Sequence, residues 1–170
     1  AHAECMAKSY AACQSSADRA LALKVDDWHA QLRKAQALVG LAQQAEGEQK
    51  FGFAKEGRKW ALKANKNNPV AHEPLLVYYQ SFGAEQKVAP ENAINSLYQV
   101  VETIPQIDEP RLMLGHELIA RKLFPAARKI LQPPAYSPHE SVEQATALAL
   151  LEKMAEPEIS GETAEGDSAT

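Results

Sequence analysis

The pattern nearest to a catalytic motif is His116-Glu117, the start of an arrangement His-Glu-x-x-His. On a helix, that arrangement places two imidazoles one turn apart on a zinc ion, and the glutamate serves as general base. Position 120 is alanine, so the second imidazole is missing. The other histidines fall in four separate segments, at His2, His29, His72 and His139. We therefore expect no metal site and no cofactor.

Signatures of nucleophilic and phosphate chemistry are also missing from the sequence. There is no Gly-x-Ser-x-Gly, and no glycine-rich loop precedes a predicted helix, where backbone amides could hold a phosphate. The pair Ser15-Ser16 is more typical of a break in a helix than of a nucleophile. We therefore expect that the chain is not an enzyme.

The two cysteines, Cys5 and Cys13, lie in a segment that we predict as one helix, residues 3–16. Eight residues of helix separate two Cα atoms by about 12 Å, whereas a disulfide requires about 7 Å or less. No Cys-x-x-Cys pattern is present. The spacing therefore predicts two small buried thiols and no bond between them.

A row of basic residues is the sharpest surface feature of the sequence. Lysines recur every three or four residues in a predicted helix, and we call this set the basic face: Lys55, Arg58, Lys59, Lys63 and Lys66. A solvated helix face is the most common meaning of such a row. Two alternatives are docking of an acidic segment and binding of nucleic acid or an anionic membrane. Phe53 and Trp60 are predicted to point away from this face, so no aromatic side chains are available there to stack on bases.

Charge and composition set further limits. The 170 residues are 45% hydrophobic with a net charge of -4, which is typical of one soluble domain. Residues 156–170 hold five acidic and no basic residues, so we predict a disordered acidic tail after a repeat domain of residues 1–155. The remaining chain is near neutral, which argues against a nucleic-acid partner. No run approaches the roughly 18 apolar residues of a membrane span.

Apolar residues recur at intervals of three and four, and no segment alternates with period two, which predicts an all-α fold. Turn signals divide the chain into predicted helices at 3–23, 28–46, 49–65, 72–82, 90–104, from 110 onward, 126–131 and 138–154. The last of these begins after Ser137-Pro138-His139-Glu140, which has the pattern of a capping box. Pro133 and Pro134 are expected to end the helix before it.

A repeat is visible in the turns. Asp26-Asp27-Trp28, Asn67-Asn68-Pro69 and Asp108-Glu109-Pro110 follow one another at a spacing of 41 residues. Each interval holds two predicted helices. Such a hairpin cannot bury its apolar face alone, so the hairpins must stack on one another.

Between residues 5 and 131 the chain resembles the tetratricopeptide repeat (TPR) family, whose unit is a helical hairpin of about 34 residues. Leu114-Gly115 is similar to the small-residue contact of the first helix, Ala127 to the close-packing alanine and Leu131 to the large apolar position. Pro105 corresponds to the proline that closes the previous unit. The resemblance implies a right-handed α-solenoid of about three hairpins with a C-terminal capping helix.

The TPR resemblance also implies a function: binding a protein or peptide on a concave surface without catalysis. The expected contact residues lie on the first helices of the hairpins, away from the apolar stripe: His29, Arg33, Glu73, Tyr79, Gln80 and Arg111. We expect no nucleic-acid partner. The sequence leaves the compartment open.

A narrower resemblance implies a second hypothesis. Residues 63–69, 75–82, 92–94, 97–98 and 135–139 are similar to the C-terminal repeat region of some bacterial proteins, in which a metalloprotease-like domain precedes the repeats. The chain would then be an accessory segment that packs on an upstream domain. An apolar patch left exposed in the isolated segment would promote a homo-oligomer.

Overall fold

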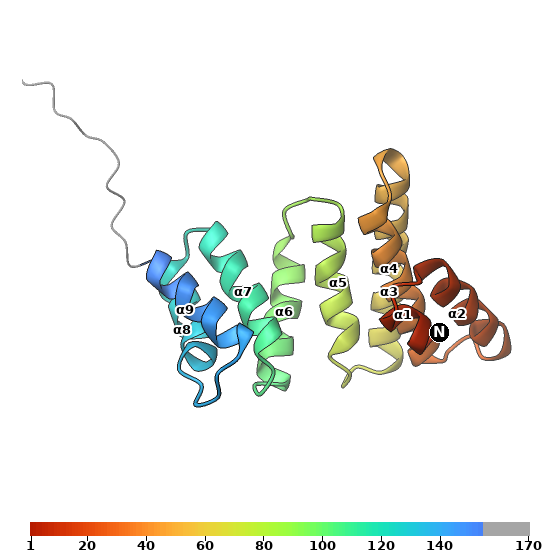
Figure 1. The fold of residues 1–170 in the computed structure, drawn as a ribbon. Helices are drawn as coiled ribbons and strands as arrows, with labels where there is room; N and C mark the ends of the chain where they lie inside the picture. Colours follow the sequence, from red (N-terminus) through yellow and green to blue (C-terminus); the bar gives the residue numbers. More distant parts are fainter. Residues whose placement is uncertain (155–170) are drawn as a thin grey trace, which may run out of the picture.

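The computed structural model describes residues 1–154 (Figure 1), and the predicted acidic tail at 156–170 lies outside the described residues. Within residues 1–154 the chain is all helical, which confirms the predicted fold class. The nine helices of this part are α1 (His2–Met6), α2 (Tyr10–Leu23), α3 (Trp28–Gln44), α4 (Gly47–Asn67), α5 (Glu73–Ala84), α6 (Glu91–Thr103), α7 (Asp108–Ala120), α8 (Phe124–Ala135) and α9 (Val142–Lys153).

The helices form a solenoid of antiparallel hairpins. Figure 1 shows α3–α4, α5–α6 and α7–α8 side by side in one row, with α1 and α2 at one end and α9 at the other. Each hairpin packs on the next along the chain, and α9 covers α7 and α8. The solenoid with a C-terminal capping helix is therefore confirmed.

Small residues hold α3 and α4 close together. Ala35, Ala54 and Ala61 are fully buried between these helices. A Cβ atom added to Gly57 would lie 3.3 Å from the carbonyl oxygen of Ala35 and 3.0 Å from a methyl group of Val39. Close approach of two helices needs such small side chains, because larger ones would force the backbones apart.

In the third hairpin the predicted packing residues meet as the TPR resemblance implies. Leu114, Ala127 and Leu131 are fully buried. A Cβ atom on Gly115 would overlap the side chain of Leu131, so only glycine leaves room for that leucine. The predicted small-residue contact is confirmed.

Three of the four hairpins share one type of turn. The first helices α1, α5 and α7 end with a Schellman motif, in which the amides of Ser9, Lys87 and Leu123 donate to carbonyl oxygens five residues earlier. The preceding residue adopts positive φ in each case: Lys8 (57°), Gln86 (57°) and Lys122 (59°). The turn after α3 uses Gly47 (56°). These four residues recur 39, 39 and 36 residues apart, so α1–α2 is a shortened hairpin of the same series.

The turn at Lys8 overturns two predictions about the N-terminus. Residues 3–23 form two helices instead of one, and the break lies at residues 7–9, not at Ser15-Ser16. Because the chain reverses there, Cys5 and Cys13 come together with Cα atoms 5.1 Å apart and form a disulfide. The prediction of two unpaired thiols was wrong because it assumed a continuous helix.

The start of the last helix also differs from the prediction. α9 begins at Val142, and its cap is Ser141, whose side chain accepts a hydrogen bond of 3.0 Å from the Gln144 amide. Ser137 accepts only a 3.4 Å bond from the amide of His139, in the turn before the helix. α8 continues through Pro133 and Pro134 to Ala135, so both prolines lie in its last turn, where each lacks the amide that would donate to the carbonyl four residues earlier. α8 therefore ends later than predicted.

The three full hairpins differ in length. Their first helices start at Trp28, Glu73 and Asp108, so the spacing is 45 and then 35 residues. α4 accounts for most of the difference, because it has 21 residues whereas α6 has 13, and α3 with 17 residues is also longer than α5 with 12. The 41-residue period of the turn signals is close to the mean of two unequal units.

Candidate functional site

A groove of about 550 Å³ lies between α5 and α7, and we call it the main groove. Its apolar wall consists of Ala84, Val88, Met113 and Ala120. Polar side chains line the rest, with Gln43 from the end of α3, Gln80 from α5, and Lys87 and Arg121 from the turns that follow α5 and α7. The first helices of three hairpins therefore build one surface.

A hydrogen-bonded bridge crosses the main groove. Tyr79 on α5 donates its phenolic proton to Glu117 on α7 over 3.0 Å, and Arg121 Nε donates to the same carboxylate over 2.7 Å. Arg121 also donates to the carbonyl oxygen of Ala89, over 2.6 Å. Burial and the bond to Glu117 raise the pKa of Tyr79, so the phenol stays protonated and remains a donor near neutral pH. The bridge fixes the distance between α5 and α7.

A second hollow of about 190 Å³, the N-terminal pocket, lies beside the main groove. Its walls include Cys5 and Met6 from α1 and Gln36 from α3. Gln43 and Gln80 line both hollows, so the two are neighbours on the same surface. The surface thus extends from α1 to α7.

Tyr10 on α2 also lines the N-terminal pocket, and its position depends on a glycine of α3. A Cβ atom on Gly40 would overlap the ring of Tyr10. Because Gly40 carries no side chain, the tyrosine ring packs directly on α3 and holds the start of α2 there. This contact is independent of the disulfide.

Three of the six predicted contact residues line this surface or bond to a residue that lines it. Tyr79 and Gln80 line the main groove. Arg33 Nη1 donates to Gln36 over 2.7 Å, and the carboxylate of Glu73 on α5 interacts with its charge. Burial lowers the pKa of Arg33, and Glu73 opposes this effect. His29 is exposed at the start of α3, with its ring 3.8 Å from that of Trp28.

Arg111 is a predicted contact residue that lies on a different surface. Its guanidinium donates from Nε to the carbonyl oxygen of Pro105, over 3.2 Å. It lines a cleft of about 460 Å³ between α6 and α8, together with Tyr98 and Lys129. These are second helices, so the cleft belongs to a different surface from the main groove.

Four members of the predicted basic face are exposed on α4: Lys55, Lys59, Lys63 and Lys66. The fifth, Arg58, faces α5 and forms an ion pair with Glu85, whose side chain is only 2% exposed. Lys87 lies 3.1 Å from the other oxygen of that carboxylate. Burial by itself raises the pKa of Glu85, but the hydrogen bonds from Arg58 and Lys87 outweigh it and lower the pKa. Arg58 is therefore a packing residue between α4 and α5.

Trp60 lies between the basic face and the core. Its indole ring packs against the main hydrophobic cluster, as predicted. The ammonium groups of Lys34 and Lys63 lie 4.3 and 4.7 Å from the ring centroid. At these distances the cations are attracted to the ring, so Lys63 interacts with Trp60 and is not fully solvated.

Sequence reasoning missed several residues of the main groove, chiefly Glu117, Arg121 and Lys87. In the sequence, Glu117 stands out only as part of an incomplete zinc motif, although it accepts the bonds from Tyr79 and Arg121. Arg121 and Lys87 follow the ends of their helices, where no glycine marks a turn. Basic residues near helix C-termini are a general signal that could have pointed to them.

Two structural observations bear on other classes of function. Within residues 1–154, no group of three or more His, Cys, Asp or Glu side chains is arranged to hold a metal ion. None of the helices described there is both long and apolar enough to cross a membrane. His116 is exposed on α7, apart from the other histidines.

The stacked hairpins and their shared turns define a TPR-like helical repeat fold. A crystal structure of a thermophilic TPR protein from Thermus thermophilus is similar to this chain, with a TM-score of 0.67 and 16% sequence identity. The likeness covers 81% of this chain and 71% of that protein. No protein-family model and no curated protein matches the chain. The structural likeness confirms the predicted TPR-like fold.

Proposed function

We propose that this chain is a non-catalytic interaction module that binds a segment of a partner protein in the main groove. The observation that carries the proposal is the groove itself, about 550 Å³ with an apolar wall and a polar rim, built by three helices of separate hairpins. Binding sites for small groups are typically concave and apolar with few polar contacts. A TPR-like scaffold is compatible with such a role.

The chemistry of the groove favours a peptide segment with one apolar side chain and nearby acidic or backbone carbonyl groups. Met113, Val88 and Ala84 offer the apolar contact. Gln43 and Gln80 provide amides that can both donate to and accept from a peptide backbone. Lys87 and Arg121 add positive charge, although each is also paired with a carboxylate of the chain.

Preorganisation supports the proposal energetically. The Tyr79 bridge fixes α5 against α7 before any partner arrives, and the Arg58 ion pair fixes α4 against α5. A surface that is already ordered loses little conformational entropy on binding, so more of the contact energy appears as affinity.

Two glycines with open surroundings provide the test. A Cβ atom on Gly83, which lines the main groove, or on Gly52, which lies on α4, meets no atom within 4 Å. Gly83→Trp should therefore project an indole ring into the groove from a Cβ that meets no neighbouring atom, and Gly52→Trp is a matched control outside it. We expect a partner captured from the native lysate by the wild-type chain to be retained by Gly52→Trp and reduced at least tenfold by Gly83→Trp.

Circular dichroism of both variants shows whether each keeps the helical content of the wild type. Equal capture by the wild type and both folded variants would show that the main groove is not the binding site. The second hypothesis, an accessory segment that packs on an upstream domain, stays a prediction. That the chain has no nucleic-acid partner stays a prediction, and so does its self-association.

A further inference from the structure

We propose that the Cys5–Cys13 disulfide is a redox latch. It holds α1 in place as the N-terminal wall of the surface that comprises the N-terminal pocket and the main groove, which we call the groove surface. Reduction of the disulfide releases that wall. The relevance to binding rests on the function proposed above, whereas the latch itself is a property of the chain alone. The proposal stands on the weak packing of α1, the place of the disulfide and the unequal exposure of its two sulfurs.

α1 has little apart from the disulfide to hold it. The helix has five residues and contains no fully buried side chain. Isolated helices of this length are unstable in water, because too few hydrogen bonds form to offset nucleation. Its turn places Lys8 at positive φ, a conformation that costs about 1 kcal/mol for a residue other than glycine.

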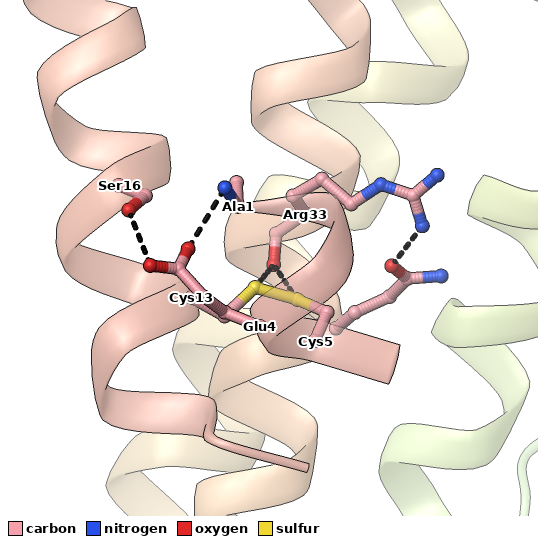
Figure 2. The surroundings of a disulfide bond; sticks show 7 residues. Ala1, Glu4, Cys5, Cys13, Ser16 and Arg33 are labelled. Carbon is pink, nitrogen blue, oxygen red and sulfur yellow. Dashed lines mark hydrogen bonds and ion pairs between the residues drawn. A yellow bond between two sulfur atoms is a disulfide. The ribbon is translucent and has the colours of Figure 1, made fainter. Parts of the chain in front are cut away.

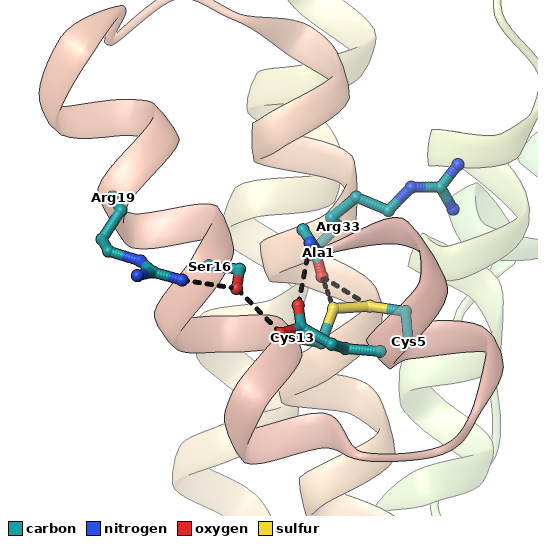
Figure 3. Close-up of polar contacts among 7 residues, drawn as sticks. Ala1, Cys5, Cys13, Ser16, Arg19 and Arg33 are labelled. Atoms are coloured by element: carbon teal, nitrogen blue, oxygen red, sulfur yellow. Dashed lines mark hydrogen bonds and ion pairs between the residues drawn. A yellow bond between two sulfur atoms is a disulfide. The ribbon is translucent and has the colours of Figure 1, made fainter.

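The polar contacts of α1 are few. Ser16 on α2 donates to Glu4 over 3.1 Å and accepts from Arg19, also over 3.1 Å (Figure 3). Arg19 is exposed, and a hydrogen bond between side chains contributes only about 1 kcal/mol. These contacts position α1, but they do not replace a covalent bond.

The disulfide joins α1 to α2 and lies against the N-terminal half of α3. Figure 2 shows both sulfur atoms beside the carbonyl oxygen of Arg33, at 3.6 Å for Cys5 and 3.5 Å for Cys13. Neither sulfur carries a proton in the disulfide, so these are packing contacts and not hydrogen bonds. The side chain of the same Arg33 reaches Gln36, which lines the N-terminal pocket. The disulfide therefore anchors α1 where the groove surface begins.

The two sulfurs differ in access. Cys13 is fully buried, whereas Cys5 is partly exposed and lines the N-terminal pocket. A thiolate of a dithiol reductant can therefore attack Cys5 Sγ from the pocket, and Cys13 leaves as a thiolate that takes a proton. The second thiolate of the reductant then attacks the mixed disulfide and releases Cys5 as a thiolate, which is protonated in turn. The dithiol is oxidised to its own disulfide, and the chain gains two electrons and two protons.

Reduction should affect a limited part of the chain. Without the covalent bond, α1 loses its main anchor, and Cys5 and Met6 leave the wall of the N-terminal pocket. Tyr10 stays, because its ring packs on Gly40 independently of the disulfide. The change should end at the start of α2 and leave the hairpins from α3 to α8 intact.

Hydrogen exchange by mass spectrometry on the whole chain tests the latch without any partner. The amides of Cys5, Ala7, Lys8 and Ser9 are hydrogen-bonded in the oxidised chain. We expect dithiothreitol to speed their exchange more than tenfold and to leave α5–α9 unchanged. The double variant Cys5→Ser/Cys13→Ser should match the reduced chain and should not respond to dithiothreitol.

Each of the following results would contradict the proposal of a redox latch. Unchanged exchange at residues 5–9 would show that packing alone holds α1. Faster exchange throughout α2–α9 would show that the disulfide stabilises the whole fold instead of one wall. A further readout is the site of the mixed disulfide formed with glutathione, which should be Cys5; modification of Cys13 first would contradict the access argument. Since neither measurement uses a partner, failure of the latch is distinguishable from failure of the proposed binding function.

Discussion

The structural role of a residue in this chain depends more on its surroundings than on its amino-acid type. Arg58 stands in a row of basic residues that are exposed, yet it alone turns to the buried carboxylate of Glu85. Its guanidinium also lies 4.5 Å from the ring centroid of Phe82. A buried carboxylate is tolerated only when it is paired, so these two residues depend on each other.

Removing the cation of this pair should destabilise the chain strongly. We expect Arg58→Met to lower the free energy of unfolding by about 3 kcal/mol, because Glu85 would remain buried without its main partner. Lys59→Met is the matched control, because Lys59 pairs with Glu56 at the surface and should cost about 0.5 kcal/mol or less. Urea unfolding measures both. Equal losses in the two variants would contradict the structural role of Arg58.

The lowered pKa of Glu85 predicts a dependence of stability on pH. The unfolded chain binds the proton near the ordinary value of 4.5, whereas the folded chain binds it at lower pH. The stabilisation from Glu85 is thus present above pH 4.5 and is lost as the pH falls through the folded pKa. Chemical unfolding across acidic pH should show a shallower decline for Glu85→Gln than for the wild type. Glu56→Gln, at the surface, should follow the wild type.

At the scale of elements, the structure differs from the sequence-based predictions at the ends of helices and not in their interiors. Three first helices end in Schellman motifs whose left-handed residue is Lys8, Gln86 or Lys122. Glycine is the usual residue there, because it has no Cβ to strain. The chain therefore stores some strain at three equivalent turns, and the sequence carries no glycine that would reveal them.

Relief of this strain should stabilise the third hairpin. We expect Lys122→Gly to raise the free energy of unfolding by about 0.5 to 1 kcal/mol, because glycine adopts positive φ without strain. Lys129→Gly, in the interior of α8, should lower it by about 1 kcal/mol through its poor helix propensity. Thermal unfolding of the two variants compares them directly, and a loss of stability in Lys122→Gly would argue against the left-handed turn.

The start of α9 gives a second prediction at this scale. Ser141 accepts the capping hydrogen bond from Gln144, so Ser141→Ala should cost about 1 kcal/mol. Ser137→Ala should cost only a few tenths of that amount, because Ser137 lies in the turn before the helix. Chemical unfolding distinguishes the two. A larger loss of stability in Ser137→Ala than in Ser141→Ala would instead support the helix start after Ser137 that the sequence pattern predicted.

Residues 1–154 form a short solenoid whose two ends are covered by different elements. Inner hairpins bury both faces against their neighbours, but the terminal ones need a cover. At the N-terminus, the cover is the shortened hairpin α1–α2 with its disulfide. At the C-terminus, α9 covers the third hairpin, where Leu131, Ala135 and Ala147 form one buried cluster.

Removal of the C-terminal cover should disturb more than the helix removed. We expect a chain that ends at residue 137 to lose more helical ellipticity than the 12 residues of α9 account for, because α7 and α8 would expose Leu131 and Ala135. Exposed apolar surface of this kind also promotes self-association. Circular dichroism and light scattering measure the two effects. A loss equal to α9 alone, without association, would show that the third hairpin needs no cover.

The sequence by itself determined the all-helical fold and its division into stacked hairpins, because apolar residues at intervals of three and four need partner helices to be buried. Its resemblance to the TPR family also implied that Gly115, Ala127 and Leu131 are packing residues, and the structure confirms this. Tyr79 and Gln80 were predicted as contact residues and lie in the main groove.

Only the tertiary structure decided which residues far apart in the chain meet. The pairing of Arg58 with Glu85, the bridge from Tyr79 to Glu117 and the Cys5–Cys13 disulfide all depend on how turns orient successive helices. The turns after α1, α5 and α7 use Lys8, Gln86 and Lys122, which have no local preference for positive φ. The energy that holds them there comes from packing of the whole solenoid, so no local pattern in the sequence could reveal it.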